Sequence, residues 1–276
     1  MSKRLTVKEK NKELAKQGLQ LKNYGLVLRI YPNENQAELI NKTFGCVRLV
    51  YNNFLSSRQV HYKATGKSLS VSKYKKEILN PSKKSEEFAF LKEVDKFALE
   101  VACENVDDAY TRFFKGQNKY PIFKSKKHAK KSYTTKMTNN NIEVKGLSCI
   151  KLPKLGMVTM AKVKTKRNKN ILEKIDQGIV KILKATISQK GSKYYVSLTL
   201  EEVIFLVESQ DINSLDLSKV IGIDLGLKTF ATIHNGSKTD SVEKKKYIRA
   251  SEEKLAKLQR KLVKKTQRIM ITQKLG

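Results

Sequence analysis

Residues 180–201, "VKILKATISQKGSKYYVSLTLE", decide the fold class of the central part of the chain. Along the second half of this stretch, apolar and polar side chains alternate with the period of a half-buried strand. The apolar positions are Val196, Leu198 and Leu200. The break "KGS" at 190–192 carries the glycine that is typical of a tight β-hairpin turn. The stretch therefore predicts two antiparallel strands joined by a hairpin.

Shorter runs with the same period precede the hairpin. "YGLVLRIYP" (24–32) ends at a proline, and "NIEVKG", "CIKLPKLG" and "MVTMAKVK" follow one another between 141 and 164. Because all these runs alternate, we expect 24–32 to join the strands of 133–202 in one antiparallel β domain.

Residues 33–132, which interrupt this β domain, have the period of helices instead. Apolar residues recur at spacings of three and four after a cap at Asn33 or Asn35. A short helix stopped by Asn80-Pro81 is expected over 72–79, and a long helical stretch over 85–116. We therefore expect an inserted helical domain.

The two ends of the chain differ from this middle part. Residues 1–23, rich in lysine and glutamine, predict a basic N-terminal arm, and residues 203–218 predict a linker. The last part, 219–276, begins with a strand pair, has a possible third strand near 246–248, and ends in a helix capped by Ser251. The strand pair is expected at 220–225 and 229–234.

Charge dominates the composition. The 276 residues include 57 Lys+Arg and 26 Asp+Glu, which gives a formal net charge of +31. Self-repulsion at this level destabilises a compact state unless a polyanion compensates. The basic residues are interleaved with aromatic ones along the chain, unlike a disordered basic tail. Nucleic acid is therefore the expected partner, and a membrane surface is less favoured because no strongly amphipathic helix stands out.

Cysteine spacing and hydropathy restrict the remaining classes. Cys46, Cys103 and Cys149 lie far apart without a C-x-x-C pair, so we expect no zinc site and no disulfide framework. Cys46 and Cys103 fall in apolar helical stretches, and we interpret them as small core residues. No apolar run of 18 residues is present, and the N-terminus lacks the apolar core of a signal peptide. We expect a cytoplasmic, nucleoid-associated protein with no membrane partner, and leave its oligomeric state open.

A single aspartate, Asp224, interrupts the apolar stretch "VIGIDLGLKTFAT" (220–232). The stretch predicts a buried strand, and aspartate is rarely buried unless it is paired or holds a metal. In ribonuclease H-like folds the first strand carries such an aspartate, which bridges two divalent metals. Two alternatives stay open: a nucleotide-binding turn of the actin-like ATPase kind, and an aspartate that only ends a strand and caps a turn.

Seven stretches, taken in order, resemble the TnpB/OrfB family of transposon-encoded proteins, which are RNA-guided nucleases with a RuvC-type domain. Together they cover about residues 24–266. They are "GCVRLVYNNFLSSR" (45–58), "ALEVACENVDDAYTRFFKG" (98–116), "YPIFKSKK" (120–127), "IKLPKLGMV" (150–158), "KYYVSL" (193–198), "IGIDLGLKTFAT" (221–232) and "EEKLAKLQRKLVKK" (252–265).

The resemblance implies an α+β multidomain protein. A β-barrel-like wedge domain (24–32 plus 133–202) would carry an inserted helical recognition domain (33–132), followed by the first part of a RuvC (ribonuclease H-like) domain (219–276). The resemblance also implies a guide RNA from the transposon end and target or transposon-end DNA as partners, with Mg²⁺ as the cofactor of DNA cleavage. In such effectors base pairing supplies sequence specificity while the protein contacts the backbone.

Two of these motifs supply candidate nucleic-acid contacts. In "YPIFKSKK" we expect the lysines to contact phosphates, with a solvated edge as the alternative, and Phe123 to pack into the core. The lysines are Lys124, Lys126 and Lys127. Arg48 and Arg58 lie ten residues apart on one helix, about 80° from sharing a face. They can share a broad surface on RNA or DNA, or be ordinary exposed charges.

The family's chemistry also needs a Glu on a later strand and an Asp on a final helix, and neither has a counterpart in the 52 residues after Asp224. We therefore interpret Asp224 as a vestigial catalytic residue in an incomplete metal site, where Mg²⁺ is not productively bound. We expect a C-terminally truncated, nuclease-inactive protein that keeps RNA and DNA binding, and we attribute its divergent last ten residues to a frameshift or premature stop. The alternatives are a non-catalytic regulator of the element, a non-functional gene remnant, and a nuclease completed by a partner chain.

Overall fold

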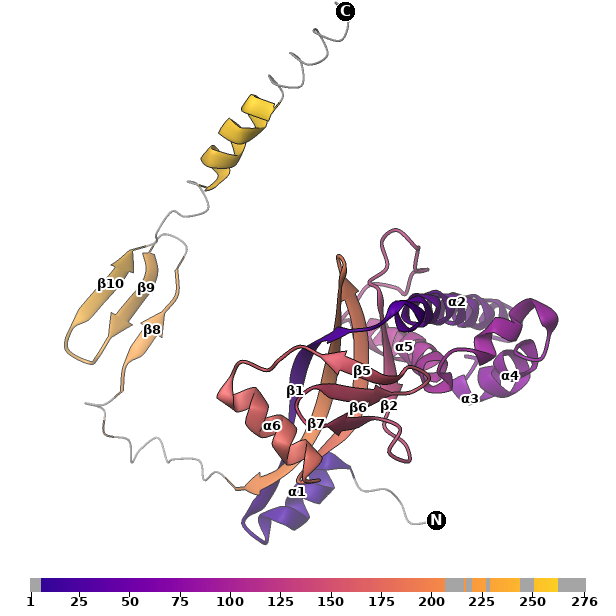
Figure 1. The fold of residues 1–276 in the computed structure, drawn as a ribbon, viewed down its shortest axis with the longest axis horizontal. Helices are drawn as coiled ribbons and strands as arrows, with labels where there is room; N and C mark the ends of the chain where they lie inside the picture. Colours follow the sequence, from indigo (N-terminus) through magenta and orange to yellow (C-terminus); the bar gives the residue numbers. More distant parts are fainter. Residues whose placement is uncertain (1–5, 207–215, 217–219, 227–228, 244–250, 263–276) are drawn as a thin grey trace, which may run out of the picture. The chain divides into compact units, whose positions relative to one another are not determined.

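The structure is a computed structural model of the chain, and it describes residues 6–206, 216, 220–226, 229–243 and 251–262. The chain divides into two compact units, residues 1–206 and 207–276 (Figure 1). The first unit combines one large sheet with a group of helices, and the second contains a small sheet.

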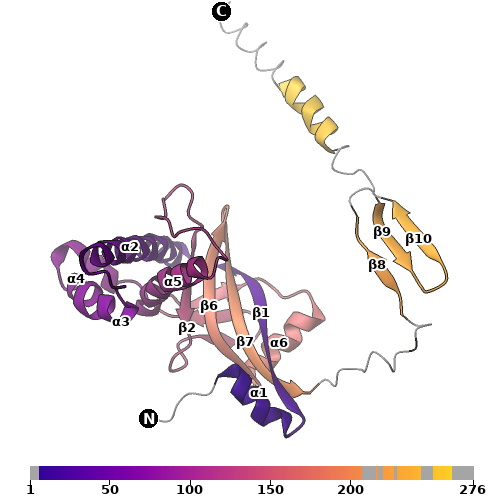
Figure 2. The ribbon, with the colours of Figure 1, turned by 180° about the vertical axis from the view of Figure 1, so that it is seen from behind.

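A seven-stranded antiparallel sheet forms the frame of the first unit (Figures 1 and 2). Its strands lie in the order β2-β6-β7-β1-β5-β4-β3. Their bounds are β1 Leu19–Tyr31, β2 Ser132–Lys136, β3 Glu143–Lys145, β4 Cys149–Leu152, β5 Gly156–Met160, β6 Val180–Lys190 and β7 Lys193–Phe205. The hairpin expected around 190–192 is confirmed, because Lys190 lies opposite Lys193. β1 pairs with both β7 and β5, which confirms that the strand predicted at 24–32 joins this sheet.

One buried cluster contains residues from every strand of this sheet. The alternation predicted for β7 is confirmed, since Val196, Leu198 and Leu200 are all fully buried. Tyr133 of β2 and Val144 of β3 belong to the same cluster, although these strands lie at opposite ends of the strand order. The sheet therefore curls until both of its ends face one core, which is how a β-sheet approaches a barrel.

A second core lies among the helices that interrupt the sheet, which gather on one side of it in both views (Figures 1 and 2). These elements are α2 Glu34–Thr65, α3 Val71–Tyr74, the π-helix Lys75–Leu79, α4 Asn80–Ser82, the 3₁₀ helix Glu86–Lys92 and α5 Lys96–Phe114. Asn33 caps α2 in a reciprocal capping box with Gln36, and Gly66 ends the helix in the left-handed conformation. Ile40 and Phe44 of α2 enter the sheet core while later residues enter the helical core, so α2 ties the two cores together.

Several predicted boundaries are corrected by pairing across the sheet. β1 begins at Leu19 rather than at residue 24, because its first residues pair with the end of β7, where Leu19 lies opposite Phe205. The interpretations of 1–23 as an arm and 203–218 as a linker therefore each miss part of a strand. Residues Val7–Ala15 also form a capped helix, α1.

Two helical predictions are corrected as well, and one helix was missed. The stretch expected as one helix from 85 contains a 3₁₀ helix with a non-helical residue at Phe88, and α5 starts only after Asp95. The expected stop at Asn80-Pro81 is wrong, because the backbone stays helical from the π-helix into α4, where Pro81 lies in the first turn. Helix α6, Lys166–Asp176, was not predicted at all, although Thr165 caps it.

The second unit contains a three-stranded antiparallel sheet in the order β10-β9-β8. Its strands are β8 Gly222–Asp224, β9 Thr229–His234 and β10 Thr239–Glu243, and residues 251–262 are helical as predicted. The third strand expected at 246–248 lies outside the described residues, and β10 precedes that position.

Candidate nucleic-acid interface

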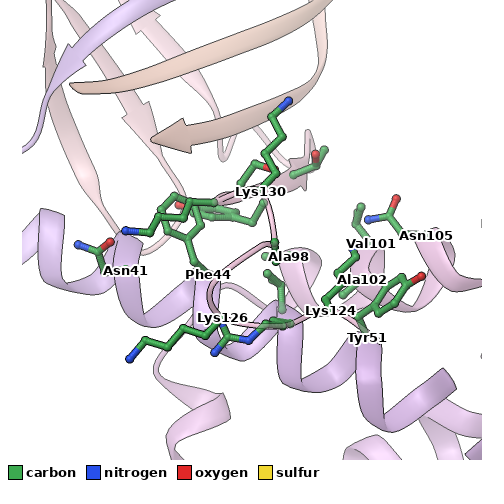
Figure 3. A pocket seen from close by; sticks show the side chains of 18 of the residues that line it. Asn41, Phe44, Tyr51, Ala98, Val101, Ala102, Asn105, Lys124, Lys126 and Lys130 are labelled. Carbon is green, nitrogen blue, oxygen red and sulfur yellow. The ribbon is translucent and has the colours of Figure 1, made fainter. Parts of the chain in front are cut away.

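A groove of about 1000 Å³ lies between α2, α5 and the segment that leads from α5 into β2. Figure 3 shows Phe44 and Tyr51 from α2, Ala98 and Ala102 from α5, and lysines of the connecting segment around it. The small alanine side chains of α5 leave room between the two helices and this segment. The sequence of α5 therefore creates the hollow that the basic residues border.

The charge of this groove has one sign. Six of its lining residues are cationic and none is acidic. The cations are Arg48, Arg112, Lys124, Lys126, Lys130 and Lys131. A concave surface lined by one sign of charge concentrates its field and attracts counter-ions of the opposite sign. The groove therefore attracts polyanions, and its basic side chains can bind phosphate groups.

Asn52 on α2 fixes the position of Lys124 in this groove. The Asn52 side-chain amide donates to the Lys124 carbonyl oxygen at 2.9 Å, and its Oδ1 accepts from the Lys124 N–H at 2.8 Å. One side chain thus pairs with both backbone groups of Lys124, as a neighbouring strand would. The connecting segment is therefore attached to α2 at the residue that carries the charge.

The ammonium group of Lys124 lies 3.7 Å from the centroid of the Tyr51 ring. Much of the Lys124 side chain is open to solvent, but this end of it is partly desolvated, which lowers the pKa of the ammonium group. Desolvation likewise raises the pKa of the Tyr51 hydroxyl. The cation–π contact holds the charge at the groove wall before any ligand arrives.

The structure brings together three of the five predicted contact residues. Arg48, Lys124 and Lys126 line the groove, whereas Lys127 is exposed but lies outside the lining. Phe123 was expected in the core, and this is wrong: its side chain is 53% exposed. Pro121 is the buried residue of this motif instead.

Arg58 lies outside the groove and has partners within the protein. Its Nη1 donates to Oδ1 of Asp107 at 2.7 Å, and its guanidinium lies 4.4 Å from the Tyr110 ring centroid. Only 12% of the Arg58 side chain is exposed. These contacts join α2 to α5, so Arg58 has a role in packing the two helices. The sequence had suggested that Arg58 shares a nucleic-acid surface with Arg48.

Sequence reasoning missed three of the groove cations, Arg112, Lys130 and Lys131. Arg112 follows Ala98, Ala102 and Asn105 at helical spacings of four, three and seven, so these residues share one stripe of α5. This helical spacing from Ala98 and Ala102 is the signal in the sequence that would have found Arg112.

Asp224 belongs to the second unit and does not have the surroundings predicted for it. It ends β8, lies opposite Thr232 of β9, and is exposed, as are Gly222 and Ile223. The expectation of a buried strand here is therefore wrong for the described residues. One carboxylate supplies too few oxygen ligands for Mg²⁺, so Asp224 alone does not fit a two-metal site.

Neither a metal-binding cluster nor a membrane-spanning helix is present in the described ranges. They contain no group of three or more His, Cys, Asp or Glu side chains placed to hold a metal ion. None of the helices that the structure describes combines the length and the apolar character needed to cross a bilayer.

A family model, HTH_OrfB_IS605, described as a helix-turn-helix domain, matches residues 23–67. In the structure this segment consists of most of β1 and then α2, a single helix of 32 residues. The matched segment is thus a strand followed by one helix. Its contribution to the groove comes from the face of α2 that carries Arg48 and Tyr51.

Three curated proteins are similar to this chain. A Streptomyces pristinaespiralis protein named as an RNA-guided DNA endonuclease is 29% identical over 240 residues, which cover 86% of this chain and 54% of that protein. InsQ of Escherichia coli K12, named in the same way, is 25% identical over 240 residues, covering 86% and 53%. Virulence protein VsdF of Salmonella dublin is 39% identical over 109 residues, covering 37% and 91%. The chain therefore spans about half the length of the first two relatives.

Two solved complexes also show a limited likeness. The Cas12f1–sgRNA–target DNA complex matches with a TM-score of 0.47 and 10% identity, covering 87% of this chain and 69% of that chain. A CRISPR-Cas12f ternary complex matches with a TM-score of 0.38 and 14% identity, covering 84% and 53%. Both scores are below 0.5, so neither likeness establishes a shared fold.

Proposed function

Because the chain belongs to the TnpB/OrfB family of transposon-encoded proteins, we propose that residues 6–206 are the nucleic-acid-binding part of an RNA-guided DNA endonuclease. The observation that carries this proposal is the groove of about 1000 Å³ with six cations and no acidic lining residue. Its partners would be a guide RNA from the transposon end and target or transposon-end DNA. These partners would place the protein on the nucleoid in the cytoplasm.

The arrangement of the groove supports binding to a phosphate backbone. Lys124 is held by Asn52 and Tyr51 without a ligand, so little side-chain freedom remains to be lost when a phosphate binds. The lining also includes the amides of Asn41 and Asn105, which can donate to phosphate or sugar oxygens. The 33–132 helices and the sheet would thus act as recognition and wedge parts that share one nucleic-acid surface.

The second part of the proposal concerns Asp224. We assign it the place of the first carboxylate in a RuvC-type, ribonuclease H-like site, because it is the residue of this chain that matches that family motif. Cleavage with two Mg²⁺ ions needs several carboxylates around the metals. We therefore propose that this chain binds nucleic acid but does not cleave it unless carboxylates from elsewhere complete the site.

The binding proposal is tested by the salt dependence of RNA affinity. Fluorescence anisotropy with labelled transposon-end RNA would be followed between about 50 and 200 mM salt, where roughly six phosphate contacts change the affinity by about 10³-fold. Lys124→Ala/Lys126→Ala should reduce the slope of log affinity against log salt by about 1.5. The control, Lys8→Ala/Lys12→Ala on exposed α1, removes the same charge from another surface and should leave the slope nearly unchanged.

Equal changes in the two double variants would show that the groove is not the binding surface. Absence of binding at low salt would refute the nucleic-acid function itself. The cleavage part is tested by adding matched DNA with and without Mg²⁺ to wild-type protein and to Asp224→Ala. We expect no cleavage in either case, and Mg²⁺-dependent cleavage that disappears in Asp224→Ala would contradict the proposal.

A further inference from the structure

Four aromatic rings form one cluster at the C-terminal end of α5 and in the segment that follows it. The Tyr110 ring centroid lies 6.2 Å from that of Phe114 and 5.6 Å from that of Tyr120. Phe113 completes the cluster, with its centroid 5.3 Å from both Phe114 and Tyr120. Phe114 is nearly parallel to Tyr110, at 24°, whereas Phe113 and Tyr110 meet Tyr120 edge-on.

The outer ring of this cluster is open to solvent. Phe114 is 77% exposed and Tyr120 is 46% exposed. Single exposed apolar residues are common on protein surfaces. Phe114 differs because it is fixed against other rings, so its free face is presented in a defined orientation.

Polar contacts behind the rings hold the cluster in place. The hydroxyl groups of Tyr110 and Tyr120 are hydrogen-bonded at 3.0 Å. The Arg58 guanidinium lies over Tyr110 and is itself paired with Asp107. Burial, and next the hydrogen bond with Tyr120, raise the pKa of Tyr110 to about 12. The platform is therefore preorganised by α2 and α5.

The charge around the cluster indicates the kind of ligand. Residues 111–131 contain eight Lys and Arg residues and no Asp or Glu. Arg112, two residues before Phe114, and Lys124, four residues after Tyr120, both line the groove. Two residues of an α-helix are about 200° apart, so Phe114 projects away from the face of α5 that carries Arg112, and an RNA chain would have to pass around the C-terminal end of α5 to reach both. A ligand that fits both features has an anionic backbone and flat apolar faces.

We propose that Phe114, supported by Phe113 and Tyr120, is a stacking platform for an unpaired base of the RNA bound in the groove. This inference rests on the proposed function, and it specifies that the RNA has single-stranded nucleotides where it leaves the groove. In a duplex the base faces are covered by neighbouring pairs, so only an unpaired or terminal base can use the ring. Stacking of this kind accepts any base, since every base has a π-face.

The test compares three labelled RNAs in anisotropy measurements: a blunt duplex, the same duplex with a single-stranded tail, and the same duplex with an abasic tail. We expect wild-type protein to bind the tailed duplex more tightly than the other two. Phe114→Ala should remove this gain, a loss of about fivefold or more in affinity for the tailed duplex. Phe114→Trp should retain the gain, and Phe114→Leu, which is apolar but not flat, should lose it.

Phe205→Ala is the matched control, because Phe205 is 82% exposed and lies at the end of β7. Phe205→Ala should still bind the tailed duplex more tightly than the blunt one. Thermal melts should show that all variants are folded. A gain that persists in Phe114→Ala, or that the abasic tail reproduces, would overturn the stacking proposal while leaving duplex binding intact. Affinities for all three RNAs that do not change in Phe114→Ala would also overturn it and would favour a protein partner. Absence of binding to every RNA would refute the proposed function and this inference with it.

Discussion

Gly45 provides a test in which stability and binding are expected to change in opposite directions. It lies inside α2 and lines the groove. Glycine within a helix destabilises it by about 0.5–1 kcal/mol relative to alanine. A Cβ atom added at Gly45 would meet no heavy atom within 4 Å beyond its own helix and chain neighbours. The packing of the protein therefore does not require glycine here, and the space in front of it is the groove.

We expect Gly45→Ala to raise the free energy of unfolding by about 0.5–1 kcal/mol, because alanine fits without a clash and favours the helix. We expect the same substitution to weaken RNA binding, because the methyl group occupies the groove floor where a ligand approaches. Displacing one charge-assisted contact lowers affinity by about tenfold or more. Gly45→Leu should weaken binding further while α2 remains well formed.

Urea denaturation followed by circular dichroism would give the stability, and anisotropy with transposon-end RNA would give the affinity. Ser56→Ala is the control, since Ser56 is exposed on α2 outside the groove lining and alanine also favours the helix there. It should raise stability slightly and leave affinity unchanged. If Gly45→Ala stabilises the protein and binds RNA as tightly as wild type, the ligand does not approach α2 at this point and the reasoning is refuted.

Three further predictions concern contacts outside the groove. Asp95→Ala should lower the free energy of unfolding by about 1–2 kcal/mol in urea denaturation, because buried Asp95 accepts from two N–H groups at the start of α5, one at each carboxylate oxygen. Asp95→Asn should lose less stability than Asp95→Ala, because its side chain keeps one acceptor oxygen. Arg58→Ala should destabilise the protein by about 1–2 kcal/mol, a value that allows for a weaker ion pair because Asp107 is half exposed. The affinity for a blunt RNA duplex should not change. Weaker duplex binding at unchanged stability would show instead that Arg58 contacts nucleic acid, as the sequence suggested. The hydrogen bond from Lys174 holds the pKa of Glu202 below its usual value. The ionised carboxylate therefore contributes its full stabilisation above the unfolded-state pKa of about 4.3. This contribution is lost as the pH falls through the lower folded-state pKa. Thermal melts should therefore show the stability advantage of wild type over Glu202→Gln shrinking below about pH 4.3, and an advantage that grows on acidification would contradict this.

The parts of the fold that were predicted correctly depend on neighbours in sequence. The β6–β7 hairpin follows from alternation around one glycine-containing turn, and α2 follows from an asparagine cap at one end and a glycine at the other. The errors occur where pairing between segments far apart in sequence determines the length of an element. β1 extends back to Leu19 because β7 continues far enough to pair with it, and periodicity within β1 alone carries no information about that length.

Motif order, local periodicity and composition can be read along one chain, and they were sufficient to predict the family, the antiparallel sheet with inserted helices, and the strongly basic character. Which charges act together depends on the tertiary packing. Arg48, Arg112 and Lys124 come from three separate segments and converge because α5 packs against α2 and Asn52 pairs with the backbone of Lys124. The same packing turns Arg58 toward Asp107 and away from the groove. Convergence of this kind depends on side-chain volumes and hydrogen bonds between segments far apart in sequence, which no local pattern records.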